Sequence, residues 1–294
     1  MFESYYGFTS APFALNPDPG FYFASKGHSR ALSYLQYGVY QREGFIVVTG
    51  EIGSGKTTLV RTLLQGLNPA DIVAAQISNT QLDSNELLHA ICQAFGIPVA
   101  GYTKSYLLGA LENFLTSVAA QGRRALLVVD EAQNLGLREM EELRMLSNYQ
   151  FEDHALLQSF LVGQPELRQL LKSVALEQLR QRIIASCHLG PLSPAEVRSY
   201  VEHRLAQVGW KGDDPSVSDG AFVAIHRHSG GIPRRINLLC TRVLLATWLA
   251  EARVIDEEAV EVAADEMRSE TFTDEEPPTV GQAPAGPVLV KKLP

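Results

Sequence analysis

The sequence predicts an α/β fold: a three-layer domain with a parallel sheet between layers of helices, followed by a small domain built only of helices. Between residues 45 and 189, apolar runs of strand length alternate with helical patterns. This alternation is typical of a parallel sheet covered on both faces. From Leu192 onward the pattern contains helices only. A glycine-rich loop at residues 50–57 lies between the first strand and the helix that follows it.

Residues 1–43 are predicted to form an N-terminal arm and a first helix. The arm is rich in aromatic residues and prolines, as in Pro12-Phe13-Ala14-Leu15-Asn16-Pro17-Asp18-Pro19, and we expect it to be ordered. The helix is predicted from about Ser25, because apolar residues then recur at helical spacing. Its apolar face consists of Ala31, Leu32, Leu35 and Val39.

Residues 44–191 are predicted to form the sheet domain. Its strand candidates are the apolar runs at residues 45–49, 72–77, 125–129, 157–162 and 186–189. The helical patterns that separate them lie near residues 57–67, 84–95, 104–120, 137–149 and 166–172. Strands that are separated by helices are expected to run parallel.

Residues 192–268 are predicted to form the helical domain. Its start is marked by Ser193-Pro194-Ala195-Glu196, which supplies a helix cap, a proline at the first helical position and a capping-box glutamate. The expected helices lie near residues 194–208, 218–228, 233–251 and 256–268. Residues 269–294 are acidic and then rich in proline, glycine and alanine, so we expect a disordered tail.

The loop after the first strand indicates a phosphate site. It has the sequence Gly50-Glu51-Ile52-Gly53-Ser54-Gly55-Lys56-Thr57, and Thr58 continues into the helix. The glycines let several backbone N–H groups point at one anion, and the helix adds the positive end of its dipole there. We expect Lys56 to reach the β- and γ-phosphates of a nucleotide and the Thr57 hydroxyl to hold Mg²⁺. The sequence therefore predicts a nucleotide-binding protein.

The strand at residues 125–129 is followed by a pair of acids, Asp130 and Glu131. Adjacent carboxylates at the end of a strand are costly unless a cation or solvent meets them. We expect Asp130 to hold Mg²⁺, directly or through water, on the far side from Thr57. Glu131 is placed to polarise the water that attacks the γ-phosphate. An acid directly after the metal ligand favours hydrolysis of ATP over transfer to a small-molecule acceptor, which disfavours a small-molecule kinase.

Polar residues elsewhere are further candidates. Gln164 ends the strand at residues 157–162 and can contact the γ-phosphate or the attacking water, and Asn79 can restrain Glu131. The alternative for Gln164 is a solvated side chain at the end of a strand.

Arginines at other positions are candidates for binding the phosphates of a nucleotide. Arg182, and as second choice Arg180, precede the last strand and can project into a neighbouring subunit to stabilise charge on its γ-phosphate. Pro233 favours a first helical turn that holds Arg234 near the domain junction, within reach of bound phosphates. The alternative for each of these arginines is an exposed side chain on the surface.

The overall composition narrows the function classes. With 25 Lys and Arg against 33 Asp and Glu, the formal net charge is −8, which argues against a protein that coats nucleic acid by bulk electrostatics. No apolar run approaches the roughly 18–20 residues that span a bilayer, and the N-terminus lacks the features of a signal peptide. Three scattered cysteines match no metal-ligand spacing and no disulfide set. We therefore expect a cytoplasmic protein without a membrane span.

These motifs in this order resemble the AAA+ ATPases, whose fold is a P-loop NTPase domain with a helical lid. The resemblance is more specific to the ExeA/GspA-type secretion ATPases, and within them to the subfamily associated with XrtA (exosortase)/PEP-CTERM systems. It covers roughly residues 1–268. The matching segments are Tyr6-Gly7-Phe8, Asn16-Pro17-Asp18-Pro19, Asp130-Glu131-Ala132-Gln133-Asn134-Leu135, Glu142-Leu143-Arg144-Met145-Leu146-Ser147-Asn148, Leu161-Val162-Gly163-Gln164-Pro165-Glu166-Leu167, Leu179-Arg180-Gln181-Arg182-Ile183 and Gly231-Ile232-Pro233-Arg234-Arg235-Ile236-Asn237.

The resemblance implies ATP and Mg²⁺ as ligands and a homo-oligomer, arranged as a ring or an open arc, with a hexamer as one arrangement. It implies a role in envelope export or in exopolysaccharide and PEP-CTERM surface-protein assembly. Members of the family continue into a membrane span and a peptidoglycan-binding region, whereas this chain continues into a short polar tail. We therefore expect any position at the inner membrane to be peripheral and to depend on export or polysaccharide-assembly membrane proteins.

The residues leave an alternative function open. A DNA-associated switch of the transposition-regulator or initiator type uses a similar AAA+ domain. Its nucleic-acid contacts would have to come from the clustered bases Arg123-Arg124, Arg227 and Arg234-Arg235. The negative net charge and the lack of a recognisable DNA-binding module disfavour it. The aromatic residues of the arm can close over adenine or dock a neighbouring subunit, and the sequence does not separate these roles.

Overall fold

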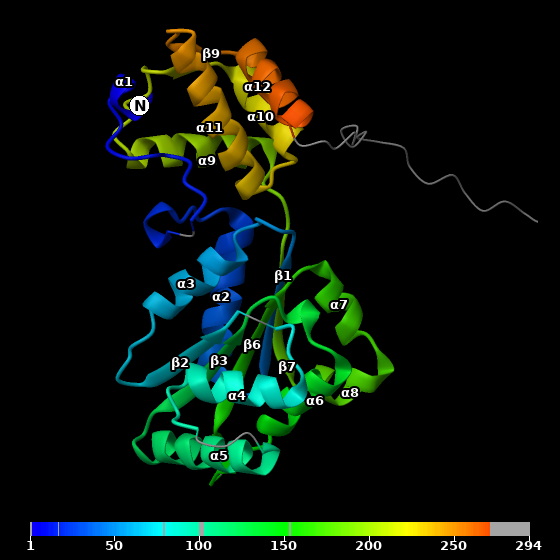
Figure 1. Cartoon of the computed structure of the whole chain (residues 1–294). Coiled ribbons are helices and arrows are strands. Elements are labelled where there is room, and N and C mark those ends of the chain that lie inside the picture. Colours follow the sequence, from blue (N-terminus) through cyan, green and yellow to red (C-terminus); the bar gives the residue numbers. More distant parts are fainter. Residues whose placement is uncertain (1, 17, 79, 100–102, 153, 271–294) are drawn as a thin grey trace, which may run out of the picture.

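The computed structural model describes residues 2–16, 18–78, 80–99, 103–152 and 154–270. A sheet domain flanked by helices and a helical domain stand one above the other (Figure 1). The tail predicted over residues 269–294 lies outside the described residues from position 271 onward, and so does Asn79. Within the described part, no helix combines the length and the apolar character needed to cross a bilayer.

The central sheet is parallel, with the strand order β2-β3-β6-β1-β7. Its strands are β1 (Phe45–Gly50), β2 (Ile72–Ile77), β3 (Arg124–Val129), β6 (Leu157–Gly163) and β7 (Ile183–Leu189). Every strand that the sequence predicts is therefore present. β7 starts at Ile183 rather than at residue 186, and it is an edge strand in which Ser186 and His188 are exposed.

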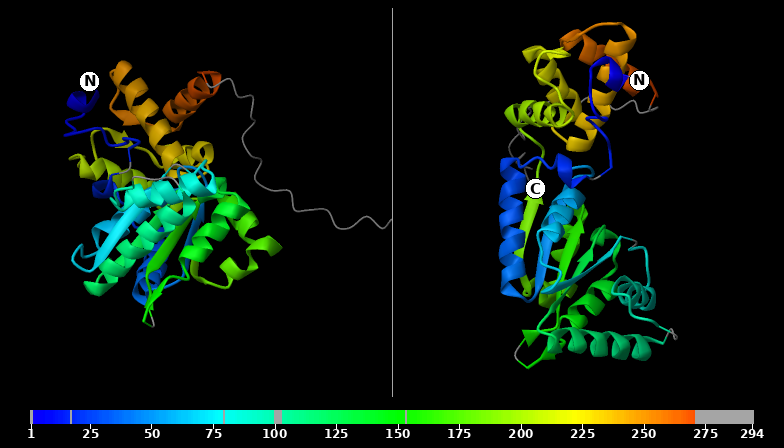
Figure 2. Two further views of the ribbon diagram at one scale, coloured as in Figure 1. Left: turned by 60° about the horizontal axis from the view of Figure 1, so that its bottom comes forward. Right: turned by 90° about the vertical axis from the view of Figure 1, so that its left-hand side faces the viewer.

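Helices cover both faces of the sheet (Figure 2). On one face, α2 (Lys26–Gln41) and α3 (Lys56–Gln65) pack against Ile46 and Val48 of β1. The opposite face, which includes Phe45 and Val47, packs against a larger layer of helices. That layer consists of α4 (Ser84–Ala94), α5 (Lys104–Ala120), α6 (Leu137–Leu146), α7 (Pro165–Leu171) and α8 (Glu177–Arg180). Every residue of β1 is buried, which explains why this strand is a continuous apolar run in the sequence.

The connection between α6 and β6 differs from the sequence-based expectation. The helix predicted over residues 137–149 ends at Leu146, and a hairpin of β4 (Gln150–Phe151) and β5 (His154–Ala155) follows. Strands of two residues are too short to leave an alternating pattern in the sequence. The 3₁₀ turns η2 (Ala132–Asn134) and η3 (Val174–Leu176) complete the connections of the sheet domain.

The helical domain follows β7. It consists of α9 (Pro194–Gln207), α10 (Asp219–Ser229), α11 (Pro233–Leu249) and α12 (Glu257–Glu270), with the short parallel strands β8 (Ser216–Val217) and β9 (Val254–Ile255). The capping box of Ser193 and Glu196 is formed at the start of α9. The helices enclose an apolar core of their own.

The N-terminal arm joins the helical domain to the sheet domain. α1 (Phe2–Tyr5) and the chain after it pack on the helical domain, where Tyr6, Phe8 and Phe13 are buried in the core. After η1 (Pro19–Phe21) the chain crosses to the sheet domain and continues into α2. The domains are therefore linked twice, by the arm before α2 and by the chain between β7 and α9 (Figure 1).

Candidate functional site

Neighbouring strands end at the same edge of the sheet, and the predicted site residues follow them. β1 leads into the glycine-rich loop, β3 into Asp130 and Glu131, and β6 into Gln164. The parallel register places Thr49 of β1 beside Gly163 of β6. Ligands of open parallel sheets bind outside the carboxyl ends of the strands. This edge, which faces the helical domain, is therefore the candidate site.

The glycine-rich loop forms a tight cradle at the start of α3. Gly53 and Gly55 have φ angles of 81° and 95°, a left-handed conformation that glycine adopts readily. The Lys56 ammonium lies inside the loop and donates to the carbonyls of Gly50 (2.7 Å) and Glu51 (2.9 Å). Burial lowers the pKa of Lys56, although the surrounding carboxylates act in the opposite direction. A lysine and backbone N–H groups gathered at a helix start form a phosphate-binding arrangement.

Thr57 and Asp130 lie beside each other at the mouth of the loop. The Thr57 hydroxyl donates to the Asp130 carboxylate over 3.3 Å. Asp130 is 7% exposed, and burial raises its pKa, so its charge is incompletely compensated by the protein. Mg²⁺ is usually held by one or two protein oxygens, with water and phosphate oxygens as its other ligands. The hydroxyl and carboxylate found here fit that ion.

No larger metal centre is visible in the part of the chain that the structure describes. There, no group of three or more His, Cys, Asp and Glu side chains is arranged to hold a metal ion. A metal at Thr57 and Asp130 would therefore need a nucleotide or water to complete its coordination.

Glu131 is held by the side chains of Gln133 and Gln164. Its Oε2 accepts hydrogen bonds from Nε2 of Gln133 (2.6 Å) and of Gln164 (3.1 Å). The Gln133 Oε1 in turn accepts from the backbone N–H of Gln164 (3.0 Å). Burial raises the pKa of Glu131, but the amides and the Lys56 charge outweigh burial and leave the pKa below its usual value. Glu131 is therefore an ionised carboxylate with a fixed direction.

The sequence assigned no role to Gln133, although it lies only two positions after Glu131. A second signal is Gly163, because a Cβ there would lie 2.6 Å from the Gln133 Oε1. The glycine at the end of β6 thus makes room for the glutamine. The backbone carbonyl of Glu131 accepts from the Thr80 hydroxyl over 2.8 Å. Asn79, which the sequence placed near Glu131, lies outside the described residues.

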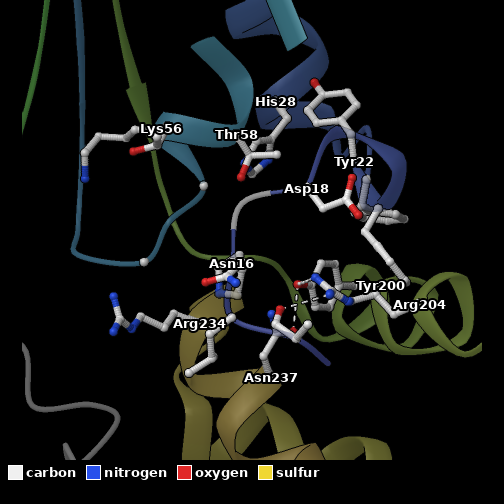
Figure 3. Close-up of a pocket in the computed structure, with 18 of the residues that line it drawn as sticks. Asn16, Asp18, Tyr22, His28, Lys56, Thr58, Tyr200, Arg204, Arg234 and Asn237 are labelled. Carbon is white, nitrogen blue, oxygen red and sulfur yellow. Dashed lines mark hydrogen bonds between the residues drawn. The ribbon is translucent and has the colours of Figure 1, made fainter. Parts of the chain in front are cut away.

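A pocket of about 210 Å³ opens beside the loop, between the sheet domain, the arm and the helical domain (Figure 3). The predicted loop residues that line it are Ile52, Gly53, Gly55, Lys56, Thr57 and Thr58. Glu131 lines it as well. The Ser54 hydroxyl is buried and has no hydrogen-bond partner among the described residues. From the arm, Phe21-Tyr22-Phe23 lines the pocket, whereas Phe13 is buried in the helical domain.

His28, at the start of α2, supports the loop from the arm side (Figure 3). Its Nε2 lies 3.0 Å from the carbonyl of Ser54, and because a carbonyl only accepts, Nε2 carries the hydrogen. Nδ1 then accepts from the Ser25 hydroxyl over 2.8 Å. Burial lowers the pKa of His28, which favours this neutral form. No motif in the sequence indicates His28, although it precedes Ala31 by three positions on the apolar face of the helix.

The helical domain touches the phosphate loop through Arg234. The Arg234 backbone N–H donates to the Gly53 carbonyl over 3.1 Å, and its side chain lines the same pocket as Lys56. A Cβ on Gly53 would lie 2.3 Å from the Arg234 Cβ. The close approach of the helical domain therefore requires glycine at position 53, and the structure brings Arg234 to the mouth of the loop.

Arg180 and Arg182 do not reach this pocket. They precede β7 and lie at the opposite edge of the sheet, since Ile183 pairs with Phe45 at the start of β1. The Arg182 Nη1 donates to the Ser147 hydroxyl over 2.7 Å. The exposed Arg180 donates to the Leu171 carbonyl over 3.2 Å. Within one copy of the chain, the site consists of the loop, the acids, Gln133, Gln164 and Arg234.

Comparison with known proteins gives one close curated relative. Residues 39–171 match the family described as AAA domain. Over 271 residues the chain is 40% identical to General secretion pathway protein A of Aeromonas hydrophila. The aligned region covers 91% of this chain and 48% of that protein. The chain thus spans about half the length of the curated relative it matches.

Solved structures of low sequence identity share the fold. Cdc6p from Pyrobaculum aerophilum superposes with a TM-score of 0.64 at 17% identity, over 90% of this chain and 70% of that one. The ADP form of ORC2 from Aeropyrum pernix gives 0.63 at 16% identity, over 88% and 73%. The RuvB Holliday junction branch migration motor of Thermotoga maritima gives 0.54 at 18% identity, over 83% and 70%. At these identities the likeness concerns the fold alone.

Proposed function

We propose that this chain, which has the fold of the AAA+ P-loop ATPases, hydrolyses ATP as an ExeA/GspA-type protein that serves envelope export. The observation that carries the ATPase activity is that Lys56, Thr57 and Glu131 line one pocket, with Asp130 bonded to Thr57 beside it. The export role is supported by the 40% identity to a secretion-pathway protein over 91% of the chain. The export role and the hydrolysis are separate claims and are tested separately.

Different residues in and beside the pocket bind the phosphates, hold the metal ion and accept a proton from water. Lys56 and the N–H groups of the loop bind the β- and γ-phosphates, and Arg234 approaches the phosphates from the helical domain. Mg²⁺ at Thr57 and Asp130 would neutralise charge on the phosphates. Glu131 is ionised and held in direction by Gln133 and Gln164, so it can accept a proton from the attacking water. With the phosphates at the loop, the sugar and base lie in the remaining part of the pocket, which residues of the arm and of α9 line.

A neighbouring copy completes the site in this proposal. Arg182 lies at the opposite edge of the sheet from the pocket of its own chain, so its guanidinium can act only on the γ-phosphate of another subunit. Arg180 is the second candidate for the same role. The assembly is then a homo-oligomeric ring or open arc, with a hexamer as one arrangement, and ATP sites lie at its subunit boundaries.

Within envelope export, we propose a role in exopolysaccharide or PEP-CTERM surface-protein assembly. The protein would act on the cytoplasmic side and reach the inner membrane through export or polysaccharide-assembly membrane proteins. The combination of motifs in the sequence supports this subfamily. Genes for an exosortase and for polysaccharide synthesis beside this gene would support it further, and a transposase neighbourhood would contradict it.

A DNA-associated switch is the competing function. The ORC2, Cdc6p and RuvB structures share the fold with this chain at 16–18% identity, and at that identity the shared fold is no evidence of a shared function. The net charge of −8 opposes binding to phosphate backbones. Export is therefore the better-supported role.

Phosphate release by the purified full chain, measured with ATP and Mg²⁺, tests the proposal. We expect turnover that EDTA abolishes and that Lys56→Ala reduces to background. Adding inner-membrane vesicles from the source organism is expected to stimulate turnover, whereas duplex DNA is expected neither to stimulate it nor to bind in the presence of ATP. Salt-dependent duplex binding that requires ATP would instead support the DNA-associated switch.

A further inference from the structure

Arg204 of α9 is a buried cation that is bonded to the arm. It is 6% exposed. Its Nε donates to the Pro12 carbonyl (2.6 Å) and its Nη2 to the Ala14 carbonyl (3.1 Å). Its guanidinium carbon lies 4.6 Å from the ring centre of Phe21 and 5.8 Å from that of Tyr200. Among the residues that the structure describes, no carboxylate forms an ion pair with Arg204.

A buried arginine without an acid is expensive unless its donors are satisfied. An apolar side chain of similar length could fill the same volume without that cost. What the guanidinium adds is a rigid planar fork of N–H donors that can hold several acceptors at fixed positions. Here the acceptors are carbonyls of the arm, in a stretch that forms neither helix nor strand. The position of that stretch on α9 therefore depends on Arg204 and on the buried Phe13 side chain.

The stretch that Arg204 holds forms a wall of the nucleotide pocket. Ala14, Leu15 and Asn16 line the pocket, yet all of them are exposed to solvent. Nothing in the hydrophobic core therefore fixes these three residues directly. Figure 3 shows Asn16 between Lys56 on one side and Tyr200 and Arg204 on the other. The arm thus lines the pocket between the phosphate loop and α9.

The contacts of Arg204 extend to the start of α11. The Tyr200 hydroxyl accepts from the Arg204 Nη1 over 3.1 Å and lies 2.8 Å from the side-chain amide of Asn237. The amide nitrogen donates to Tyr200 and to the Pro233 carbonyl (3.3 Å), and the amide oxygen accepts from Arg204 (3.2 Å). This orientation satisfies both ends of the amide. Asn237 follows Arg234 by one helical turn, so the same cluster supports the helix that touches the phosphate loop.

We propose that Arg204 is a positioning residue for nucleotide recognition, which holds the arm at residues 14–16 against the base end of the pocket. The inference rests on the proposed function, since it requires ATP to lie with its phosphates at the loop. Selection among bases then depends on backbone and side-chain groups of the arm, because bases differ in the donors and acceptors along their edges. A polar group held in one place rejects a base that cannot pair with it.

Steady-state kinetics of Arg204→Met with ATP and with GTP test this inference. Methionine keeps the length of the side chain and removes the fork. We expect the KM for ATP to rise at least tenfold and the ratio of kcat/KM for ATP over that for GTP to fall at least fivefold. A purely structural loss would instead lower the fraction of active protein, and hence kcat for both nucleotides, without changing KM or the ratio.

Arg198→Met is the matched control. Arg198 lies on the same helix with its guanidinium carbon 4.9 Å from the ring centre of Phe222, but it is exposed, pairs with Glu202 and Asp219, and lies outside the pocket. This control is expected to match the parent protein in KM and in the ratio between nucleotides.

Arg204→Lys is the second variant, for the case that Arg204→Met does not fold. Lysine keeps the cation, but its ammonium lacks the planar fork that bridges the arm carbonyls, so we expect at least a threefold rise in the KM for ATP. An unchanged KM and an unchanged nucleotide ratio in either folded variant would overturn the inference while leaving the ATPase proposal intact. A parent protein that turns over no ATP would remove both.

Discussion

At the scale of single residues, the neighbours of Glu131 determine both the pKa and the orientation of its carboxylate. Gln133 and Gln164 both donate to Oε2, and with Lys56 they lower the pKa of a partly buried acid. The same bonds fix the direction of the carboxylate. A general base needs both properties, ionisation at the working pH and a fixed orientation toward the attacking water.

Replacing Gln133 by alanine removes the shorter of these bonds. A hydrogen bond to a charged group contributes about 1.5–3 kcal/mol, so we expect turnover of ATP to fall by about tenfold or more. Because the bond lowers the pKa of Glu131, its loss raises that pKa, and the acidic limb of the pH–rate profile moves to higher pH. Gln93→Ala, at an exposed position on α4, is the control. An unshifted limb in Gln133→Ala would mean that Glu131 is not the titrating base.

The residues that a local motif defines could be predicted from the sequence. Lys56 and Thr57 belong to one short loop, and Asp130 and Glu131 directly follow one apolar strand. The structure places these residues at the same edge of the sheet. Gln133, His28 and Arg204 could not be found in that way. Their roles arise from contacts with Gln164, Ser54 and the arm carbonyls, and no local pattern in the sequence records such distant partners.

At the scale of elements, the start of α11 and the phosphate loop are in direct contact. The Arg234 backbone bonds to the Gly53 carbonyl, and no side chain at position 53 would fit between them. Through this contact, a change in the conformation of the loop can be transmitted to the helical domain. A movement of the loop at Gly53 would displace the first turn of α11, which contains Arg234.

Gly53→Ala is the variant that separates these elements. The added Cβ would lie 2.3 Å from the Arg234 Cβ, so we expect the helical domain to move away and the affinity for ATP, measured by calorimetry, to fall about tenfold. Gly122→Ala is the control, because its φ of 73° is also positive but a Cβ there meets nothing within 4 Å. Both variants carry about 1–2 kcal/mol of backbone strain. Equal ATP affinity in both would contradict a role for the contact between Gly53 and Arg234.

The elements themselves were largely predictable, since long periodic segments leave clear patterns. The three-layer sheet domain and the helical domain agree with the expected α/β fold. The exceptions have physical reasons: β7 is a partly exposed edge strand, and the β4–β5 hairpin is too short to alternate. The split of residues 1–43 between the helical domain and the sheet domain could not be predicted, because the chain before α2 forms only the short helices α1 and η1, which are too short to show an apolar periodicity.

At the scale of the whole molecule, the pocket is shared among the sheet domain, the arm and the helical domain, while Arg182 lies at the far edge of the sheet. A single copy therefore brings together the groups that we propose to bind ATP, but not the arginine that the proposed mechanism adds. The arrangement favours an assembly in which each copy completes the site of its neighbour.

Mixing two inactive variants tests the shared site. Arg182→Ala keeps a complete loop, and Lys56→Ala keeps Arg182, so mixed assemblies contain some sites with both groups. We expect the mixture to hydrolyse ATP faster than the sum of its parts. Lys56→Ala mixed with Glu131→Gln is the control, because each of these changes damages the site of its own chain and no mixture restores it. Additive activity in the first mixture at every ratio would remove the role of Arg182 between subunits, and the same experiment with Arg180→Ala decides between the two arginines.

The central claim is that the Lys56 loop and the Asp130–Glu131 pair act on one bound ATP. The most direct measurement is ATP·Mg²⁺ affinity by calorimetry together with turnover, for the parent chain, Lys56→Ala and Glu131→Gln. We expect Lys56→Ala to lose binding, and Glu131→Gln to bind ATP like the parent while its turnover falls by about 10²–10⁴-fold, the usual contribution of a general base. A Glu131→Gln protein that hydrolyses ATP at the parent rate, or a Lys56→Ala protein that binds ATP as tightly as the parent, would contradict the account.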